Sequence, residues 1–207
     1  MKAMIMLGVL AVLTPVAAGS VVISEWIYSG SDGEFIEFTN TGPDAVDMTG
    51  WSFDDDSAVP GTVDLSAFGV VEAGESVILT EADAGDFATA WGLTGVDIIG
   101  GLSANLGRND TINLFDSAST LIDELTFGDE DYAGTPRTKD ASCSIPASDY
   151  GFTLAQTTWV LSEVGDAYGS WTSAGGDIAS PGQVPEPASF ALVLLGVAVI
   201  GRRRATR

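Results

Sequence analysis

VVISEWIYSGSDGEFIEFTN, residues 21–40, is the stretch that decides the fold. Its two ends, Val21 to Tyr28 and Glu34 to Asn40, are rich in the β-branched and aromatic residues that favour β-strands. Ser29 to Gly33 between them contains only Ser, Gly and Asp, which are typical of turns. The pattern therefore predicts two strands that pair as a β-hairpin.

Short strand signals continue beyond this hairpin at a spacing of roughly 8–12 residues, which is typical of a β-sandwich. The predicted strands are Val46 to Phe53, with an irregularity at Gly50, then Ser76 to Thr80, Val96 to Ile99, Thr111 to Asp116, Thr120 to Phe127, Ala141 to Ile145 and Thr157 to Val160. A Ser-rich turn separates residues 111–116 from 120–127, so we expect a second hairpin there.

Two stretches depart from this strand pattern. A helix is predicted from Glu81 to Trp91, because Thr80 and Asp83 have the spacing of a capping box and Phe87, Ala90 and Trp91 share one helical face. The Gly- and Ser-rich residues 168–182 are expected to form a linker that leads to the membrane.

Seven segments carry a likeness to a known family. They are Ile23 to Glu25, Glu34 to Gly42, Val46 to Asp55, Ala73 to Leu79, Leu106 to Asp116, Leu121 to Asp129 and Ser180 to Gly182. Together they resemble the lamin-tail (LTD) domain, strongly over residues 23–129 and more loosely to residue 182. The resemblance implies an all-β, immunoglobulin-like β-sandwich with one short helix, occupying residues 19–183. The chain departs from the family at an Ala-Gly turn, where Pro-Gly is usual, and in an acidic insertion at residues 54–64.

The amino-terminal residues have the organisation of a secretory signal peptide. Lys2 gives a positive start, residues 3–13 are uninterruptedly apolar, and Pro15 precedes a small-residue site. Residues 1–18 are therefore predicted to direct export through the Sec machinery, with cleavage after Ala18 or after Gly19. A buried N-terminal helix is the alternative.

The carboxyl-terminal residues 184–207 combine three parts in a fixed order. Pro185, Glu186 and Pro187 form a stiff break, residues 188–201 are uncharged, and Arg202, Arg203 and Arg204 form a basic cluster. The 14 uncharged residues make a transmembrane helix of about 21 Å, short of the roughly 30 Å hydrocarbon core. The basic cluster is expected to stay cytoplasmic.

This tail resembles the PEP-CTERM sorting signal of exported proteins from Gram-negative bacteria. The resemblance implies that an exosortase-like enzyme of the inner membrane recognises the tail and removes it. Pro185, Glu186, Pro187 and Arg202 to Arg204 would then be the recognition elements. An ordinary C-terminal membrane anchor is the alternative.

Charge and residue types restrict the chemistry that the body of the chain can perform. All 29 acidic residues lie between Glu25 and Glu186, where the basic residues are Arg108, Arg137 and Lys139 alone. Nucleic acid is therefore not expected as a partner, because phosphate binding needs a positively charged surface.

The sequence has no histidine, which excludes His-dependent nucleophile systems and His-ligated zinc. We therefore predict a protein that is not an enzyme. A hydrolase with paired carboxylates is the remaining catalytic alternative.

A few residues are candidates for binding. Asp54, Asp55 and Asp56 could hold Ca²⁺, with help from Asp64, although a solvated acidic loop is the alternative because their spacing does not match an EF-hand. Residues 129–131 have the same two interpretations.

Arg108 is expected to pair with a nearby carboxylate. Cys143, the single cysteine, is expected to be a small buried residue, with a reactive or intermolecular thiol as the alternative.

The five tryptophans are the remaining candidates. They could form a platform that stacks on sugars, but core packing is the favoured interpretation, with Trp171 as the expected exception because it lies in a Gly- and Ser-rich stretch.

The prediction that follows is an exported, non-catalytic protein of the cell surface or of an extracellular polysaccharide matrix. No cofactor is expected other than a possible Ca²⁺. The alternatives are a Ca²⁺-dependent carbohydrate- or protein-binding module, a hydrolase, and a permanently anchored surface protein.

Overall fold

The computed structural model describes residues 21–132, 135–146 and 159–183. The larger of its two main sheets has six strands in the order β12 (Val160–Leu161), β11 (Cys143–Ser144), β1 (Val21–Ile27), β2 (Phe35–Asn40), β7 (Ser76–Thr80) and β8 (Asp97–Ile99). Neighbouring strands are antiparallel except β7 and β8, which are parallel and are joined through helix α1 (Ala84–Trp91).

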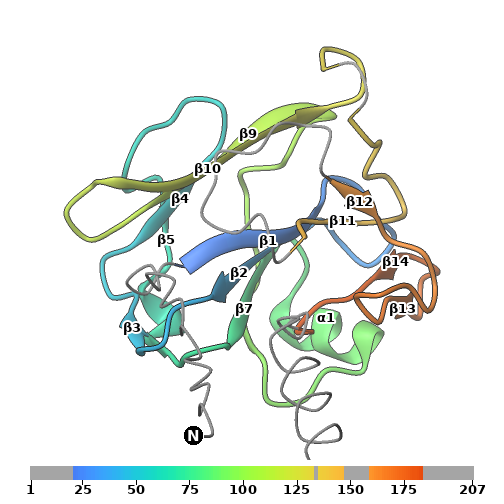
Figure 1. Cartoon of the computed structure of the whole chain (residues 1–207), viewed down its shortest axis with the longest axis horizontal. Coiled ribbons are helices and arrows are strands. Elements are labelled where there is room, and N and C mark those ends of the chain that lie inside the picture. The colour runs from blue at the N-terminus through green and yellow to red at the C-terminus, as the bar shows by residue number, and fades with distance from the viewer. Residues whose placement is uncertain (1–20, 133–134, 147–158, 184–207) are drawn as a thin grey trace, which may run out of the picture.

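The second main sheet has four antiparallel strands in the order β10 (Leu121–Gly128), β9 (Asn109–Phe115), β4 (Ser52–Asp54) and β5 (Val63–Asp64). Two small pairs, β3 (Val46–Asp47) with β6 (Val70–Val71) and β13 (Trp171–Thr172) with β14 (Ile178–Ala179), complete the strands, and a 3-10 turn, η1, spans Ser66–Phe68. Figure 1 shows the long β9–β10 ribbon at the top and α1 beside the β13–β14 pair at the lower right.

Both predicted hairpins are confirmed. β1 pairs with β2 from Val21 opposite Asn40 to Ile27 opposite Phe35, and β9 pairs with β10 along their length. The predicted strand from Val46 to Phe53 is instead divided into β3 and β4, because the chain turns between them and Gly50 has φ of 80°. A left-handed backbone of this kind suits glycine and interrupts a strand.

The main hydrophobic core lies between the two main sheets. It receives Trp26, Phe38 and Leu79 from the six-stranded sheet and Leu114 and Phe127 from the four-stranded sheet, all buried. The two sheets are also joined by a hydrogen bond from Ile23 N to Asp123 Oδ2 (2.9 Å), at irregularities in β1 and β10. The all-β architecture with one short helix is therefore as predicted.

The other face of the six-stranded sheet is also covered. Ile27, Phe35 and Ile78 point away from the main core and pack against Phe87 and Trp91 of α1. Phe35 contacts both rings edge-on, with centroid distances of 5.4 and 6.2 Å. A sheet that is buried on both faces has no free face for solvent, so its polar residues need partners inside the protein.

The start of helix α1 differs from the prediction. The helix begins at Ala84, not at Glu81, and its N-cap is Asp83, whose Oδ1 accepts hydrogen bonds from Gly85 N (2.8 Å) and Asp86 N (3.2 Å). Thr80 does not cap the helix, because its hydroxyl donates to the carbonyl of Glu34, just before the neighbouring strand β2 (2.7 Å). Aspartate is as good an N-cap as threonine, so the spacing alone could not decide between them.

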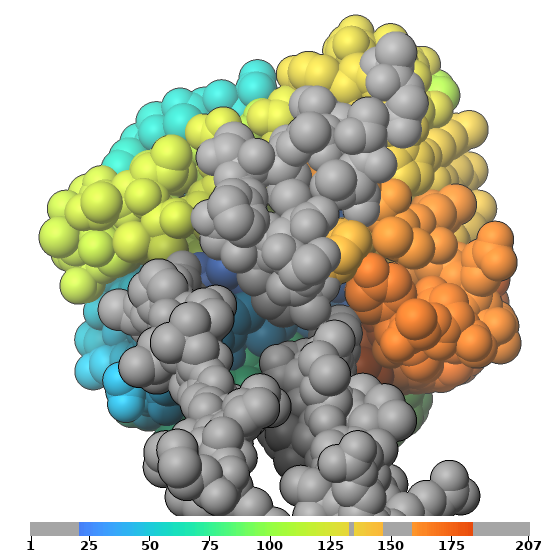
Figure 2. Space-filling model, viewed as in Figure 1, coloured from blue at the N-terminus to red at the C-terminus, as the bar shows by residue number. Residues whose placement is uncertain are grey.

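The prediction of a linker at residues 168–182 is wrong. These residues form the β13–β14 hairpin, and Ala179 is buried in the second hydrophobic cluster. Asp166 accepts hydrogen bonds from Ser170 N and Ser170 Oγ, and Asp177 Oδ2 accepts one from Asp32 N (2.8 Å). Figure 2 shows the segment after residue 158, in orange, as a compact part of the surface beside the rest of the body.

The signal peptide at residues 1–18 and the predicted transmembrane helix at 188–201 lie outside the described residues. Within the described ranges, no helix has the length and apolar character needed to cross a bilayer.

Candidate functional site

A line of polar side chains crosses three strands of the six-stranded sheet on the face that carries α1. Glu25 on β1 is directly opposite Ser144 on β11 and Glu37 on β2. Residues that are directly opposite in neighbouring strands point to the same face, so the three side chains lie in one row. Glu25 is 2% and Glu37 1% exposed, which is unusual for carboxylates.

Glu25 and Glu37 accept hydrogen bonds from the last described segment of the chain. Glu25 Oε1 accepts from Ser180 N (2.8 Å), from Ser180 Oγ (3.1 Å) and from Ser142 Oγ. Glu37 Oε2 accepts from Gly182 N (2.6 Å), while its Oε1 accepts from Ser24 Oγ (2.7 Å). The two carboxylates therefore fasten residues 180–182 to the centre of the sheet.

Hydroxyl groups extend this network to both sides. Beyond Glu25, Ser142 and Ser162 share a hydrogen bond of 2.7 Å between their hydroxyl oxygens. Beyond Glu37, Thr39 donates to Ser24 Oγ (2.8 Å) and is hydrogen-bonded to Ser76 (2.7 Å). The result is a buried polar ladder, defined by Ser162, Ser142, Glu25, Ser180, Glu37, Ser24, Thr39 and Ser76.

Burial sets the electrostatics of this ladder. Removal from solvent raises the pKa of Glu25, and removal from solvent together with the charge of Glu25 raises the pKa of Glu37. Cys143, on the adjacent strand, is buried as predicted, and its burial raises the pKa of the thiol well above its usual value. A buried thiol of raised pKa is a poor nucleophile.

A small cavity adjoins the ladder. Its volume is about 10 Å³, and Glu25, Glu37 and Ser144 are among the residues that line it. Pockets that hold organic ligands are roughly 300–1,000 Å³, so this cavity is far too small for a sugar ring. The paired carboxylates of the ladder are therefore not placed to cleave a glycosidic bond.

The predicted calcium ligands lie elsewhere and do not converge. Asp54 is buried, and its Oδ2 accepts hydrogen bonds from Ser57 Oγ (2.6 Å) and Val59 N (2.5 Å). Asp55 accepts from Ser57 N (3.3 Å), and Asp56 is exposed. In the part of the chain that the structure describes, no three Asp, Glu, Cys or His side chains are arranged to hold a metal ion. Calcium binding by this loop stays a prediction.

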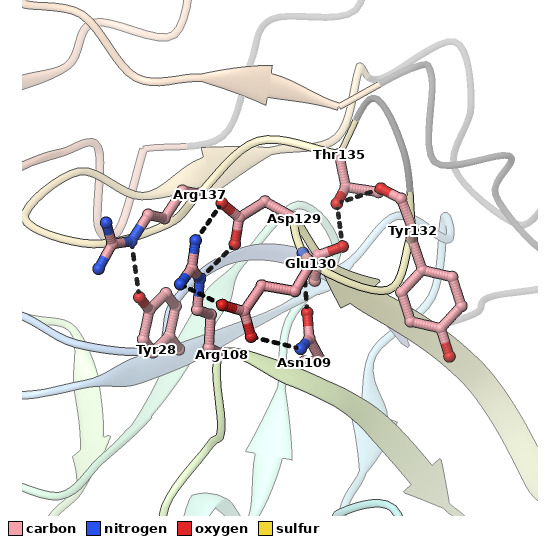
Figure 3. Close-up of polar contacts among 9 residues, drawn as sticks. Tyr28, Arg108, Asn109, Asp129, Glu130, Tyr132, Thr135 and Arg137 are labelled. Atoms are coloured by element: carbon pink, nitrogen blue, oxygen red, sulfur yellow. Dashed lines mark hydrogen bonds and ion pairs between the residues drawn. The ribbon is translucent and has the colours of Figure 1, made fainter.

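Arg108 pairs with carboxylates at the end of the β9–β10 hairpin, as predicted. Figure 3 shows its guanidinium between two acidic side chains, with Nε and Nη2 donating to Asp129 (2.6 and 2.7 Å) and Nη1 donating to Glu130 (2.5 Å). The hydrogen bond from Arg108 lowers the pKa of Asp129. Arg137, in the same view, donates to the hydroxyl of Tyr28 (3.1 Å). Asp129 and Glu130 therefore have a partner within the protein.

The tryptophans form core contacts, not a sugar platform. Trp26, Trp51, Trp91 and Trp159 are buried. Trp171, the expected exception, is half-buried: its ring packs edge-on against Trp91 at 5.8 Å, and its Nε1 donates to the carbonyl of Trp91 (3.3 Å).

A third buried carboxylate, Glu34, lies just before β2. Both of its oxygens accept a hydrogen bond from Leu106 N, at 2.9 and 3.0 Å. Burial raises the pKa of Glu34 to about 8, and the charges of Glu81 and Asp110 add to the shift. The residue therefore keeps its proton in the folded protein at a pH where an unfolded chain has lost it.

The raised pKa of Glu34 predicts that the protein becomes less stable as the pH rises from 5 to 8.5. Its folded pKa of about 8 lies above the usual 4.5, so the folded state holds a proton through this window that the unfolded state does not. The stabilisation is fully present at low pH and is lost as the pH passes the folded pKa. We expect the melting temperature to fall over this range, and to fall less steeply in E34Q. The matched control is E163Q, at an exposed carboxylate, which should retain the wild-type slope. Equal slopes in all three proteins would contradict this assignment.

Comparison with known proteins agrees with this architecture, which defines an immunoglobulin-like β domain. The Lamin Tail Domain family profile matches residues 14–129, more than half of the chain. The chain belongs to the lamin tail domain family. The PEP-CTERM protein-sorting motif matches residues 183–205. No curated protein matches the chain significantly.

These matches establish the general route of the protein. The sorting motif marks a protein that an exosortase sorts across the membrane toward the cell surface. Lamin tail domains and sorting motifs are both non-catalytic kinds of domain.

Sequence reasoning missed Glu25 and Glu37 as a site. Each lies on a predicted strand, and a glutamate on a half-buried strand usually occupies its solvated face. The signal was present in another form, because Ile23 to Glu25, Glu34 to Gly42 and Ser180 to Gly182 are three of the segments that carry the family resemblance. The structure brings these three segments together.

Proposed function

We propose that the protein is an exported, non-catalytic component of the cell surface or of an extracellular polysaccharide matrix, and that an exosortase-like enzyme processes its tail. One observation carries this proposal: the sorting motif begins at residue 183, directly after the segment that closes the folded domain. The chain therefore leaves the β-sandwich next to the proposed recognition elements, Pro185 to Pro187.

The proposed route has three stages. The Sec machinery exports the chain, and cleavage after Ala18 removes the signal peptide. The helix at residues 188–201 then holds the chain in the inner membrane for a limited time, because it is too short for a stable span. Processing at the tail finally releases the anionic body to the outside.

A structural or adhesive role suits the body better than a catalytic one. The sequence offers no histidine, and the carboxylate pair of the polar ladder is enclosed beside a cavity of about 10 Å³. High negative charge keeps such a body soluble and favours cationic partners.

Mass spectrometry of the mature protein tests the sorting proposal. We expect the protein recovered from the cell surface to begin after Ala18 and to lack Arg202 to Arg204. The double variant P185A/P187A should keep the tail and accumulate in the inner membrane, whereas the control E163A, an exposed change on the body, should be processed normally. Surface protein that retains the intact arginine cluster would instead indicate a permanent anchor.

A further inference from the structure

We propose that the cavity beside the polar ladder is a binding site for one hard divalent cation, held by the carboxylates of Glu25 and Glu37 and by the hydroxyl of Ser144. Ca²⁺ is the probe of choice, because it takes carboxylate, hydroxyl and carbonyl oxygens in flexible geometry. This site is distinct from the acidic loop at residues 54–56, and the inference does not depend on how the tail is processed.

The hydrogen bonds of the two carboxylates favour their ionised forms. Two of the donors, Ser180 N and Gly182 N, are backbone N–H groups, which donate and can never accept. Ser142 and Ser24 add hydroxyl donors to Glu25 and Glu37. These donors act against burial, which raises the pKa of both groups, and a bound cation would complete the stabilisation of the ionised pair.

No basic side chain of the described residues neutralises this pair. Arg108 is engaged by Asp129 and Glu130, and Arg137 donates to Tyr28. Lys139 is exposed at the surface. The titratable groups that lie near the pair are Asp166, whose charge also acts on Glu25, the thiol of Cys143 and the phenol of Tyr168, which lines the cavity. None of these groups supplies a positive charge, and buried charges are normally paired with an opposite charge or with a metal ion.

Ser144 provides an independent sign of a ligand. It is 3% exposed, it lines the cavity, and its hydroxyl has no hydrogen-bond partner among the described residues. Polar side chains as buried as this are normally satisfied, so an orphan hydroxyl needs an explanation. Because Ser144 is directly opposite Glu25, its oxygen and the two carboxylates border the same space.

The size of the space selects the ligand. A cavity of about 10 Å³ has room for one water-sized particle. Bound Ca²⁺ lies about 2.3–2.6 Å from its oxygen ligands, so a single ion between the carboxylates is compatible with such a volume. The ion would join β11, β1 and β2 with the closing segment at residues 180–182, and would therefore stabilise the attachment of that segment.

Calorimetry and thermal unfolding of the full chain in mild detergent test this site. After treatment with EDTA and removal of the chelator, we expect CaCl₂ at pH 7.5 to bind with one-to-one stoichiometry and to raise the melting temperature in a saturable manner. E37Q should bind Ca²⁺ at least tenfold more weakly, and its melting temperature should not respond to Ca²⁺. S144A, a smaller change that leaves both carboxylates in place, should weaken binding without preventing folding.

A double variant of the acidic loop, D55N/D56N, is the matched control and should bind Ca²⁺ as the wild type does. The proposal is overturned if the wild type shows neither heat nor a melting shift with CaCl₂ or MgCl₂, which would indicate that a proton and a water molecule fill the site. It is equally overturned if E37Q and S144A bind like the wild type, or if only the loop variant loses binding.

Discussion

A chain that ends at Asp129 should not unfold cooperatively, whereas a chain that ends at Gln183 should. The Lamin Tail Domain match stops at residue 129, but β11 and β12 extend the six-stranded sheet from beyond that point. The shorter chain loses the β11 partner of β1 and the donors that Ser180 and Gly182 give to Glu25 and Glu37. The two carboxylates then lose these donors, and buried polar groups that are left with unsatisfied oxygens are strongly destabilising.

Circular dichroism during heating, on chains that start at residue 19, measures this difference. The longer chain should show one sharp transition, and the shorter chain a gradual, non-cooperative change. A third chain that ends at Ala179 removes Ser180 to Gln183 but keeps the β13–β14 hairpin, and should unfold cooperatively at a lower temperature than the longest chain. If the chain that ends at Asp129 melts as sharply as the longest one, the domain ends where the family match ends.

Replacing Trp26 by alanine should lower the free energy of unfolding by about 3–5 kcal/mol, the usual loss for an aromatic side chain removed from a core. Trp26 is completely buried and joins three parts of the fold. Its ring lies 5.7 Å from Phe127 of the opposite sheet and 4.8 Å edge-on from Trp159, which precedes β12. Small domains are stable by only about 5–15 kcal/mol, so the variant should be close to unfolded under mild conditions.

Urea unfolding followed by circular dichroism gives the measurement, and W26F is the matched variant. The Nε1 of Trp26 has no hydrogen-bond partner among the described residues, so phenylalanine breaks no hydrogen bond to them and keeps part of the ring contact. We therefore expect W26F to lose much less stability than W26A. A similar loss in both would show that the whole indole, and not only the ring contact that phenylalanine keeps, is needed at this position.

The parts of the fold that the sequence could predict are those with strong local signals. The hairpin of β1 and β2 follows from two β-rich runs around a Ser-Gly-Asp turn, and the pairing of β9 with β10 follows from the same kind of pattern. Burial of Cys143 and the ion pair of Arg108 were also predictable. A single cysteine is usually a small buried residue, and an arginine among many acidic residues usually pairs with a carboxylate.

The parts that could not be predicted depend on contacts between distant residues. Strands of two residues, such as β13 and β14, carry no periodicity, and their Gly- and Ser-rich surroundings are typical of a linker. Their positions are fixed by side-chain to backbone hydrogen bonds, including that of Asp32 with Gly175 N (2.7 Å), which joins residues far apart in the chain. Likewise, Glu25 and Glu37 accept hydrogen bonds from Ser180 and Gly182, which lie far along the chain.

The attachment of residues 180–182 has a consequence for how the polypeptide matures. The donors that Glu25 and Glu37 require lie 155 and 145 residues further along the chain. On the proposed export route, a polypeptide that emerges amino end first cannot complete this sheet until almost the whole body has been exported. We therefore expect the body to complete its fold only after residue 182 has been exported.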